Sequence, residues 1–416
     1  MKITDVTTAV VEANFDYVFV RVHTDEGVHG TGECFFAPGI TAVVRDFGRV
    51  LVGTDPTSVN AALARLIALA SCFGGPRGAG MAYNAVSGID AALWDLNGKL
   101  LGQPLVRLLG GAVRDEVDVY LDLHAGAGLA SLDRSMRYRT PAWASRSGRT
   151  EVGAFYFEAE DDGARGVDAM VERGREALAA GFRTVKFDLD VFAEERVAGD
   201  RALSRADVDR IRDQAAALRD GLGDAAEIAF DCHWRFDVPS ALRVAEAVAP
   251  MSPAWLEDPT PPDPASLAAV GRHGAVPVAT GENTYLLEGF IDLIDAGAAS
   301  ILQPDVQKVG GITEAVRVVT LAAKRFLPVA PHCIASPLGF LAAAHVCAAA
   351  TNVACLEFHG SDVPFWGELV DAPEPIIRDG KIRLPTRPGV GVELNEDVVR
   401  AHALPGEPVF EEGPRS

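Results

Sequence analysis

Three carboxylic acids in this sequence each close a short apolar segment, and the three segments follow one another along the chain. Asp231 ends EIAFD, Glu257 lies in AWLED, and Glu282 follows PVAT. If the segments are neighbouring parallel strands, their carboxylates share one space, where mutual repulsion would raise their pKa values. A divalent cation removes this conflict, and an all-oxygen site suits Mg²⁺ better than Zn²⁺. The alternative is that each acid caps a helix or forms its own salt bridge.

Candidate acid and base groups end further segments of the same kind. Lys186 and Asp188 lie in TVKFD, on one face of a strand because side chains alternate. His332 follows LPVAP, and Asp305, which ends SILQPD, is placed to hydrogen-bond it and raise its basicity. We expect Lys186 and His332 to approach a metal-held substrate from opposite sides, with Asp188 supporting Lys186. The alternative is a buried Lys186–Asp188 salt bridge without a role in chemistry.

Two more residues complete this set. His233 comes two residues after Asp231 and could protonate a departing hydroxyl group, although it could equally be a structural histidine. Glu357, if protonated, could donate a hydrogen bond to an enolate oxygen. Removing a proton α to a carboxylate gives a doubly charged ene-diolate, which needs strong cationic stabilisation. A Mg²⁺ site with a lysine or histidine base meets that need.

The elements that position these residues alternate between apolar strands and amphipathic helices. We predict strands at VDVYLDL, TVKFDL, EIAFD, AWLED, PVAT, SILQPD, LPVAP and NVACLEF. From Asp231 to Glu357, an ionisable residue closes a strand about every 25 residues, as expected of successive βα units. In a closed barrel such residues converge on one mouth, whereas an open sheet would spread them along a line. The sequence therefore predicts an α/β barrel.

Residues 1–112 form a separate α+β domain in this interpretation. The segment YVFVRVHTDEG predicts an antiparallel hairpin, and apolar residues on one helical face predict a helix that ends near 102–104. The barrel spans 113–358. In the remaining segment, 359–416, Asp379-Gly380 predicts a hairpin, and the segment as a whole is expected to pack back on the first domain.

The composition limits the kinds of partner. The 416 residues include 38 Lys plus Arg against 58 Asp plus Glu, a net charge of −20, which argues against nucleic acid and anionic membranes. The six scattered cysteines indicate reduced thiols. The N-terminus does not match a secretory signal and no long apolar run is present, so we expect a cytoplasmic protein.

An Arg- and Tyr-rich insertion at 124–161 and the glycine-rich loop at 71–80 are expected to contact the distal end of the substrate.

Taken together, the motifs resemble the mandelate racemase/muconate lactonizing enzyme group of the enolase superfamily over essentially the whole chain. The resemblance rests on GTGE, IDAALWDLNGKLLGQPLVRLLGG, KFD, FDCHWRF, WLEDP, ATGEN, LQPDV, APHCIASP and CLEFHG, in this order. It implies a modified (β/α)₇β barrel with an α+β capping domain built from the N-terminal and C-terminal segments. It also implies a homo-oligomer.

The resemblance assigns the site residues as follows: Asp231, Glu257 and Glu282 as Mg²⁺ ligands, Asp305 and His332 as a dyad providing the general base, and Glu357 near the enolate. His233 after the metal aspartate resembles the acid-sugar dehydratases of the galactonate and mannonate types. Lys186 matches the second-strand motif of the group, but Asp188 replaces its usual second lysine. The sixth strand carries Asp305 and no lysine, which argues against dipeptide epimerases and muconate cycloisomerases.

We therefore expect an acid-sugar dehydratase acting on an aldonate or aldarate, a small-molecule substrate. His332 would remove the C2 proton, and His233 would assist loss of the C3 hydroxyl to give a 2-keto-3-deoxy acid. Lys186 would contact the carboxylate or serve as a second base. Two alternatives stay open: a hydroxy-acid racemase or epimerase using Lys186 and His332 in turn, and a non-catalytic binding protein on the same scaffold.

Overall fold

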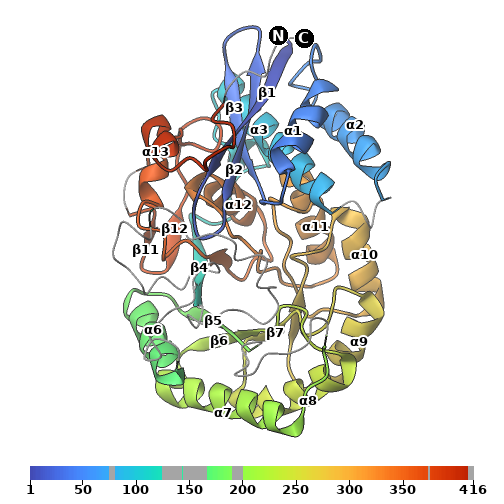
Figure 1. The fold of residues 1–416 in the computed structure, drawn as a ribbon, viewed down its shortest axis with the longest axis vertical. Helices are drawn as coiled ribbons and strands as arrows, with labels where there is room; N and C mark the ends of the chain where they lie inside the picture. Colours follow the sequence, from blue (N-terminus) through green and yellow to red (C-terminus); the bar gives the residue numbers. More distant parts are fainter. Residues whose placement is uncertain (75–79, 124–142, 144–165, 190–199, 373–374, 411–416) are drawn as a thin grey trace.

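In the computed structural model, a sheet-and-helix domain sits at one end of a ring of strands that is surrounded by helices (Figure 1). The structure describes residues 1–74, 80–123, 143, 166–189, 200–372 and 375–410. Within these ranges, no helix is both long and apolar enough to cross a membrane.

The first domain is an antiparallel sheet packed against helices. Its strands are β1 (Ile3–Val11), β2 (Tyr17–Thr24) and β3 (His29–Cys34), in that spatial order, followed by α1 (Ile40–Arg49), α2 (Val59–Ser71), α3 (Met81–Leu101) and α4 (Leu105–Leu108). The expected hairpin is confirmed, since β2 pairs antiparallel with β3. The expected helix end is also confirmed, because α3 stops at Gly102, which adopts a left-handed conformation with φ 62°.

The glycines of the GTGE motif allow β3 to lie directly on α3. A Cβ atom at Gly30 would collide with the backbone of Ala92 and Leu96, and one at Gly32 would collide with the backbone of Gly88 and Ala92. Only glycine permits this backbone approach. The close packing fixes the end of β3, where Glu33 follows Gly32.

The second part is a parallel barrel, as predicted. Its strands are β4 (Glu116–Leu123), β5 (Thr184–Asp188), β6 (Glu227–Asp231), β7 (Trp255–Glu257), β8 (Val278–Thr280), β9 (Ile301–Leu302) and β10 (Leu356–Phe358). Strands β4 to β9 pair in chain order, and β10 pairs in parallel with β4. Parallel bridges from Leu302 to Val329 and from Val329 to Val353 close the ring. The strand expected at LPVAP is thus reduced to one bridging residue, Val329.

Helices cover the outside of the ring (Figure 1). They are α6 (Val167–Ala179), α7 (Arg205–Leu222), α8 (Val238–Val248), α9 (Pro264–His273), α10 (Leu286–Ala296), α11 (Gly311–Lys324) and α12 (Pro337–Ala349). The side chains of Asp237, Asp263 and Ser336 cap α8, α9 and α12 by accepting backbone hydrogen bonds, with proline in the first turn of each helix. These caps, six to seven residues after Asp231, Glu257 and Val329, fix where the three helices begin.

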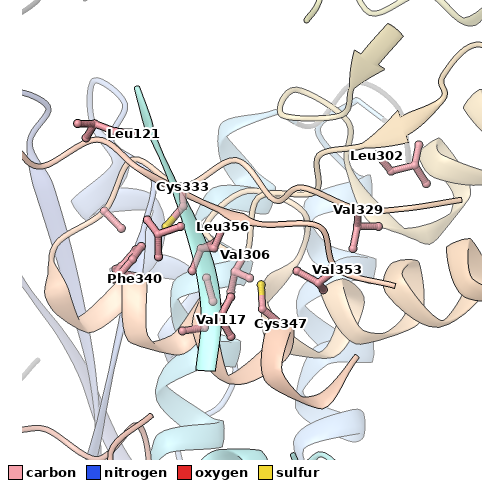
Figure 2. Close-up of a cluster of buried hydrophobic side chains, with 14 of the residues drawn as sticks. Val117, Leu121, Leu302, Val306, Val329, Cys333, Phe340, Cys347, Val353 and Leu356 are labelled. Carbon is pink, nitrogen blue, oxygen red and sulfur yellow. The ribbon is translucent and has the colours of Figure 1, made fainter. Parts of the chain in front are cut away.

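A buried apolar cluster holds the closing strands together (Figure 2). The cluster contains side chains of β4, β10 and α12 together with the bridging residues Val329 and Val353. Full burial of each such side chain stabilises the fold by about 1.5–3 kcal/mol. The cysteines are free thiols, as expected, and all except Cys72 are buried.

The C-terminal segment contacts both parts of the molecule. Its elements are β11 (Ile377–Arg378), β12 (Lys381–Arg383) and α13 (Glu396–Ala401). The hairpin at Asp379-Gly380 forms and lies against the barrel. There β12 pairs antiparallel with β4, and Arg383 and Glu116 form an ion pair of 2.8 Å across the strands. Farther along, Ala403 and Val409 form bridges to β1.

Candidate active site

The three carboxylates predicted to bind metal lie side by side at the barrel mouth. Asp231 ends β6 and is paired in register with Glu257 at the end of β7. Glu282 comes two residues after β8, beyond Gly281, whose φ of 142° suits glycine. All three are buried, with exposed fractions of 2%, 0% and 6%. The adjacency follows from parallel pairing, which carries each strand end to the same edge.

Lys186 lies in the middle of this group of acids. Its Nζ is 2.7 Å from Glu257 Oε1, 2.9 Å from Asp231 Oδ2 and 2.8 Å from Glu357 Oε1. Asp122 Oδ2 is 4.0 Å away. Glu257 is held further by Gln303 Nε2, which donates to Oε2 at 2.6 Å.

The chemistry of these ligands fits a hard divalent cation such as Mg²⁺. Burial raises the pKa of Glu257 well above its ordinary value, and the charge of Asp231 adds to this despite Lys186. Burial and Glu282 likewise raise the pKa of Asp258 to about 8. A bound cation would relieve this crowding of negative charge. In the described ranges, no three His, Cys, Asp or Glu side chains are already arranged as a metal-binding group. Lys186 and His332 contact these carboxylates instead.

His332 and Asp305 form a buried hydrogen-bonded pair. The distance from His332 Nδ1 to Asp305 Oδ2 is 2.6 Å, and Asp305 Oδ1 accepts the backbone N–H of Gln307. Nε2 of the same ring is 2.9 Å from Glu282 Oε2. Burial lowers the pKa of His332, but the charges of Glu282 and Glu357 outweigh it and raise the pKa well above 6.5. The pair can therefore hold one ring nitrogen fixed while the other faces the carboxylates.

His233 occupies the opposite flank, in a strained turn after β6. Its φ is 44° and that of Trp234 is 50°, left-handed values that non-glycine residues adopt rarely. Its backbone N–H donates to Asp231 Oδ1 at 2.8 Å, and its Nε2 is 3.7 Å from Asp231 Oδ2. His233 Nδ1 faces Asp188 Oδ1 at 3.8 Å.

Asp188 is placed differently from our expectation. In the described part of the chain, the carboxylates within 4.0 Å of Lys186 are those of Asp122, Asp231, Glu257 and Glu357. Asp188 lies two residues beyond Lys186 on the same strand face, where it is paired in register with Asp231. At this position its carboxylate faces His233. The expected contact between Asp188 and Lys186 is therefore not found.

A cavity of about 340 Å³ lies over these residues. Its floor includes Lys186, Asp231, Glu282, His233 and His332. The first domain contributes aromatic and apolar side chains on the other side, namely Phe15, Phe35, Phe36, Pro38 and Met81. Its size is typical of a small-molecule site.

Several lining residues were missed in the sequence, among them Phe35, Asn283, Tyr285 and Lys308. For Lys308 a signal existed, because it stands three residues after Asp305 and its backbone N–H closes a turn onto the Asp305 carbonyl. Asn283 directly follows Glu282 in the ATGEN motif, whereas Phe35 and Tyr285 lie in loops without a recognisable pattern. The predicted roles of the insertion at 124–161 and of the loop at 71–80 fall largely outside the described residues, and of the insertion only Trp143 is described, packed against Phe365.

Two family models match this chain. Residues 4–110 match the mandelate racemase/muconate lactonizing enzyme N-terminal domain, and residues 169–398 match the enolase C-terminal domain-like family. The two matches correspond to the first domain and to most of the barrel with the segment that follows it.

Similar proteins span nearly the whole chain. A D-xylonate dehydratase from Haloferax volcanii is 35% identical, over 99% of this chain and 91% of that protein. A D-galactonate dehydratase from Ralstonia pickettii is 30% identical, over 96% of this chain and 94% of that protein. The crystal structure of a mandelate racemase/muconate lactonizing enzyme-like protein from Rubrobacter xylanophilus superposes with a TM-score of 0.86 at 36% identity, covering 99% of both chains. The chain belongs to the mandelate racemase/muconate lactonizing enzyme group of the enolase superfamily.

Proposed function

We propose that this protein is a Mg²⁺-dependent hydro-lyase that dehydrates an aldonate or aldarate to a 2-keto-3-deoxy acid. The observation that carries the proposal is the placement of two histidines on opposite flanks of the carboxylate cluster. His332 Nε2 lies 2.9 Å from Glu282 and His233 Nε2 lies 3.7 Å from Asp231. A substrate held between them has a base on one side and an acid on the other. The similarity to D-xylonate and D-galactonate dehydratases supports the same reaction.

Asp231, Glu257 and Glu282 would hold the Mg²⁺ ion. When bound, Mg²⁺ supplies positive charge that stabilises the ene-diolate formed from the substrate carboxylate. The side chains of this protein carry the proton transfers.

His332 is the proposed general base. Asp305 accepts a hydrogen bond from Nδ1–H at 2.6 Å in this proposal, which fixes the ring so that Nε2 faces the cavity. In the reaction, Nε2 takes the proton from C2, and the electrons of that C–H bond form the enediolate.

His233 is the proposed acid for the leaving group. It donates a proton to the C3 hydroxyl as the C3–O bond breaks, and water departs. The resulting enol tautomerises to the 2-keto acid. The strained backbone at His233 and Trp234 is consistent with a side chain held for function at the cavity edge.

Glu357 and Lys186 act together in this proposal. Burial raises the pKa of Glu357, but Lys186 and His332 outweigh it and leave the pKa below its ordinary value. Glu357 is therefore an acceptor that holds Lys186, 2.8 Å away, rather than the protonated donor considered from the sequence. Lys186, which lines the cavity, places its positive charge beside the substrate carboxylate in this proposal.

Three further properties are proposed for this protein: its partners, its location in the cell and its oligomeric state. The substrate is a small molecule in this proposal, and we expect neither nucleic acid nor a membrane as partner. The cytoplasmic location and the homo-oligomeric state also stay predictions.

The test is a panel of aldonates and aldarates incubated with purified protein and Mg²⁺, with 2-keto-3-deoxy acid measured as product. We expect at least one pentonate or hexonate to be dehydrated. Inversion at C2 without dehydration, or no turnover of any acid, would overturn the proposal.

A further inference from the structure

Lys308 brings a second buried ammonium group to the cavity. It follows β9 in the turn after Asp305, its side chain is 6% exposed, and it lines the cavity. Burying an ammonium group is costly unless it is paired. Its contacts therefore decide what it can bind.

The surroundings of Lys308 differ from those of Lys186. Lys308 Nζ donates to Asn283 Oδ1 at 3.1 Å, and its nearest carboxylate oxygen is Glu282 Oε1 at 4.0 Å. Among the described residues, Asn283 is the one side chain that accepts a hydrogen bond from it. An ammonium group has three donors, so Lys308 keeps donors for a ligand, whereas Lys186 has three carboxylates within 2.9 Å.

Lys308 lies where the barrel meets the first domain. Its Nζ is 4.1 Å from the ring centroid of Phe35, which belongs to the segment after β3. The Phe35 and Phe36 rings lie 5.0 Å apart, and Phe36 and Phe15 lie 5.1 Å apart, so they form one aromatic surface. This surface offers no hydrogen-bonding groups. On the side of the cavity that faces the first domain, this apolar wall therefore lies beside the ammonium group of Lys308.

We propose that Lys308 forms the subsite for the distal end of the substrate. Its ammonium group donates hydrogen bonds to an oxygen on the carbon atoms beyond C3, and Phe15, Phe35 and Phe36 pack against the C–H groups of the same segment. The oxygen belongs to a hydroxyl group in an aldonate or to the second carboxylate in an aldarate. This inference rests on the proposed function, which places C2 and C3 between His332 and His233.

The test compares ligands that do and do not reach beyond C3. Glycerate has the reacting C2 and C3 and nothing farther, whereas pentonates and pentarates extend beyond them. Dissociation constants are measured by calorimetry with Mg²⁺ present, in the His332→Asn background to prevent turnover. Lys308→Met is compared with Lys308→Arg and with Lys324→Met, a matched exposed lysine on α11.

We expect Lys308→Met to weaken binding of the preferred pentonate or pentarate about 10- to 100-fold, as for loss of a hydrogen bond to a charged group. Glycerate binding should change less than about twofold, Lys308→Arg should recover part of the loss, and Lys324→Met should match the parent protein. A loss confined to pentarates identifies the carboxylate as the ligand, and a loss for pentonates identifies the hydroxyl.

An equal loss for glycerate and the longer acids would overturn the inference, because Lys308 would then act at the reacting end. Unchanged binding of every acid would overturn it as well. A parallel Mg²⁺ titration shows whether weaker binding of the acids is caused by weaker binding of the metal. A Lys308→Met protein that no longer binds Mg²⁺ would also contradict the subsite, because Lys308 would then act on the metal site. Failure of the proposed function has a different signature: the wild-type protein dehydrates no acid, while the binding comparison still reports on Lys308.

Discussion

Glu33 of the first domain binds Ser336 of the barrel through both of its carboxylate oxygens. The backbone N–H of Ser336 lies 3.0 Å from Oε1, and the Ser336 hydroxyl donates to Oε2. Gln307 Nε2 donates to Oε1 at 2.7 Å, and the backbone N–H of Gly339 donates to Oε2 at 3.1 Å. Gln307 follows Asp305, and Ser336 follows His332. One buried carboxylate thus joins the two loops that carry the Asp305–His332 pair.

Replacing Glu33 by alanine should reduce both stability and turnover. The substitution leaves buried donors of Gln307, Ser336 and Gly339 without their acceptor, which costs about 1–3 kcal/mol for each unsatisfied group. We expect the free energy of unfolding to fall by several kcal/mol and kcat to fall more than KM rises. Denaturant unfolding and steady-state kinetics measure these effects. Glu26→Ala, at an exposed turn of the same sheet, is the control, and equal behaviour of the two variants would contradict the argument.

Glu33 also predicts a pH dependence of stability. Burial raises its pKa from 4.5 to about 7, although hydrogen bonds from Ser336, Gly339 and Gln307 oppose the shift. The folded protein therefore holds a proton that the unfolded chain releases, so this contribution to stability is complete below pH 4.5 and is lost as pH rises to about 7. Relative to Glu33→Gln, the wild type should lose about 3 kcal/mol across this window. Parallel stability curves for the two proteins would refute the assignment.

Asp188 is predicted to act through His233. Its carboxylate is 3.8 Å from His233 Nδ1, so Asp188→Asn should lower kcat for dehydration about 10-fold while the affinity for Mg²⁺ stays the same. Combined with His233→Asn, it should add little further loss, because both changes remove one function. Asp209→Asn on the surface of α7 is the control. Additive losses in the double variant would show that Asp188 acts elsewhere.

Mg²⁺ should stabilise the folded protein. A ligand that binds the folded state alone contributes about 2.7 kcal/mol at a concentration 100 times its Kd. Thermal unfolding of chelator-treated protein should therefore shift upward when Mg²⁺ is added, and Glu257→Gln should abolish the shift. Glu246→Gln, an exposed acid on α8, should retain it. No shift in the wild-type protein would argue against a metal site at Asp231, Glu257 and Glu282.

The barrel and the order of its strand-end residues were predictable because a βα unit has a regular length. That period places Asp231, Glu257 and Glu282 on neighbouring strands, and the structure brings them together. Parallel pairing then places the ends of these strands at the same edge of the sheet, whatever contacts the individual side chains make.

Side-chain pairing was less predictable, because it depends on depth along a strand. Asp188 and Lys186 share a strand face, yet one pleat repeat separates them and assigns them different partners. Lys308 lies in a turn without periodicity, and Glu33 acts across domains, 303 residues from Ser336. The hairpin at Asp379-Gly380 was recognised by its turn residues, but its partner β4 depended on the packing of the whole tail.

The most direct test measures proton removal and dehydration separately in variants of the two histidines, with the aldonate or aldarate that the wild-type protein dehydrates. Exchange of the C2 hydrogen in D₂O and formation of the 2-keto-3-deoxy acid are followed in His233→Asn and His332→Asn proteins. We expect His332→Asn to lose both reactions, whereas His233→Asn keeps C2 exchange and loses dehydration by about 10²- to 10⁴-fold. Continued exchange in His332→Asn, or dehydration at the wild-type rate in His233→Asn, would contradict the proposed roles.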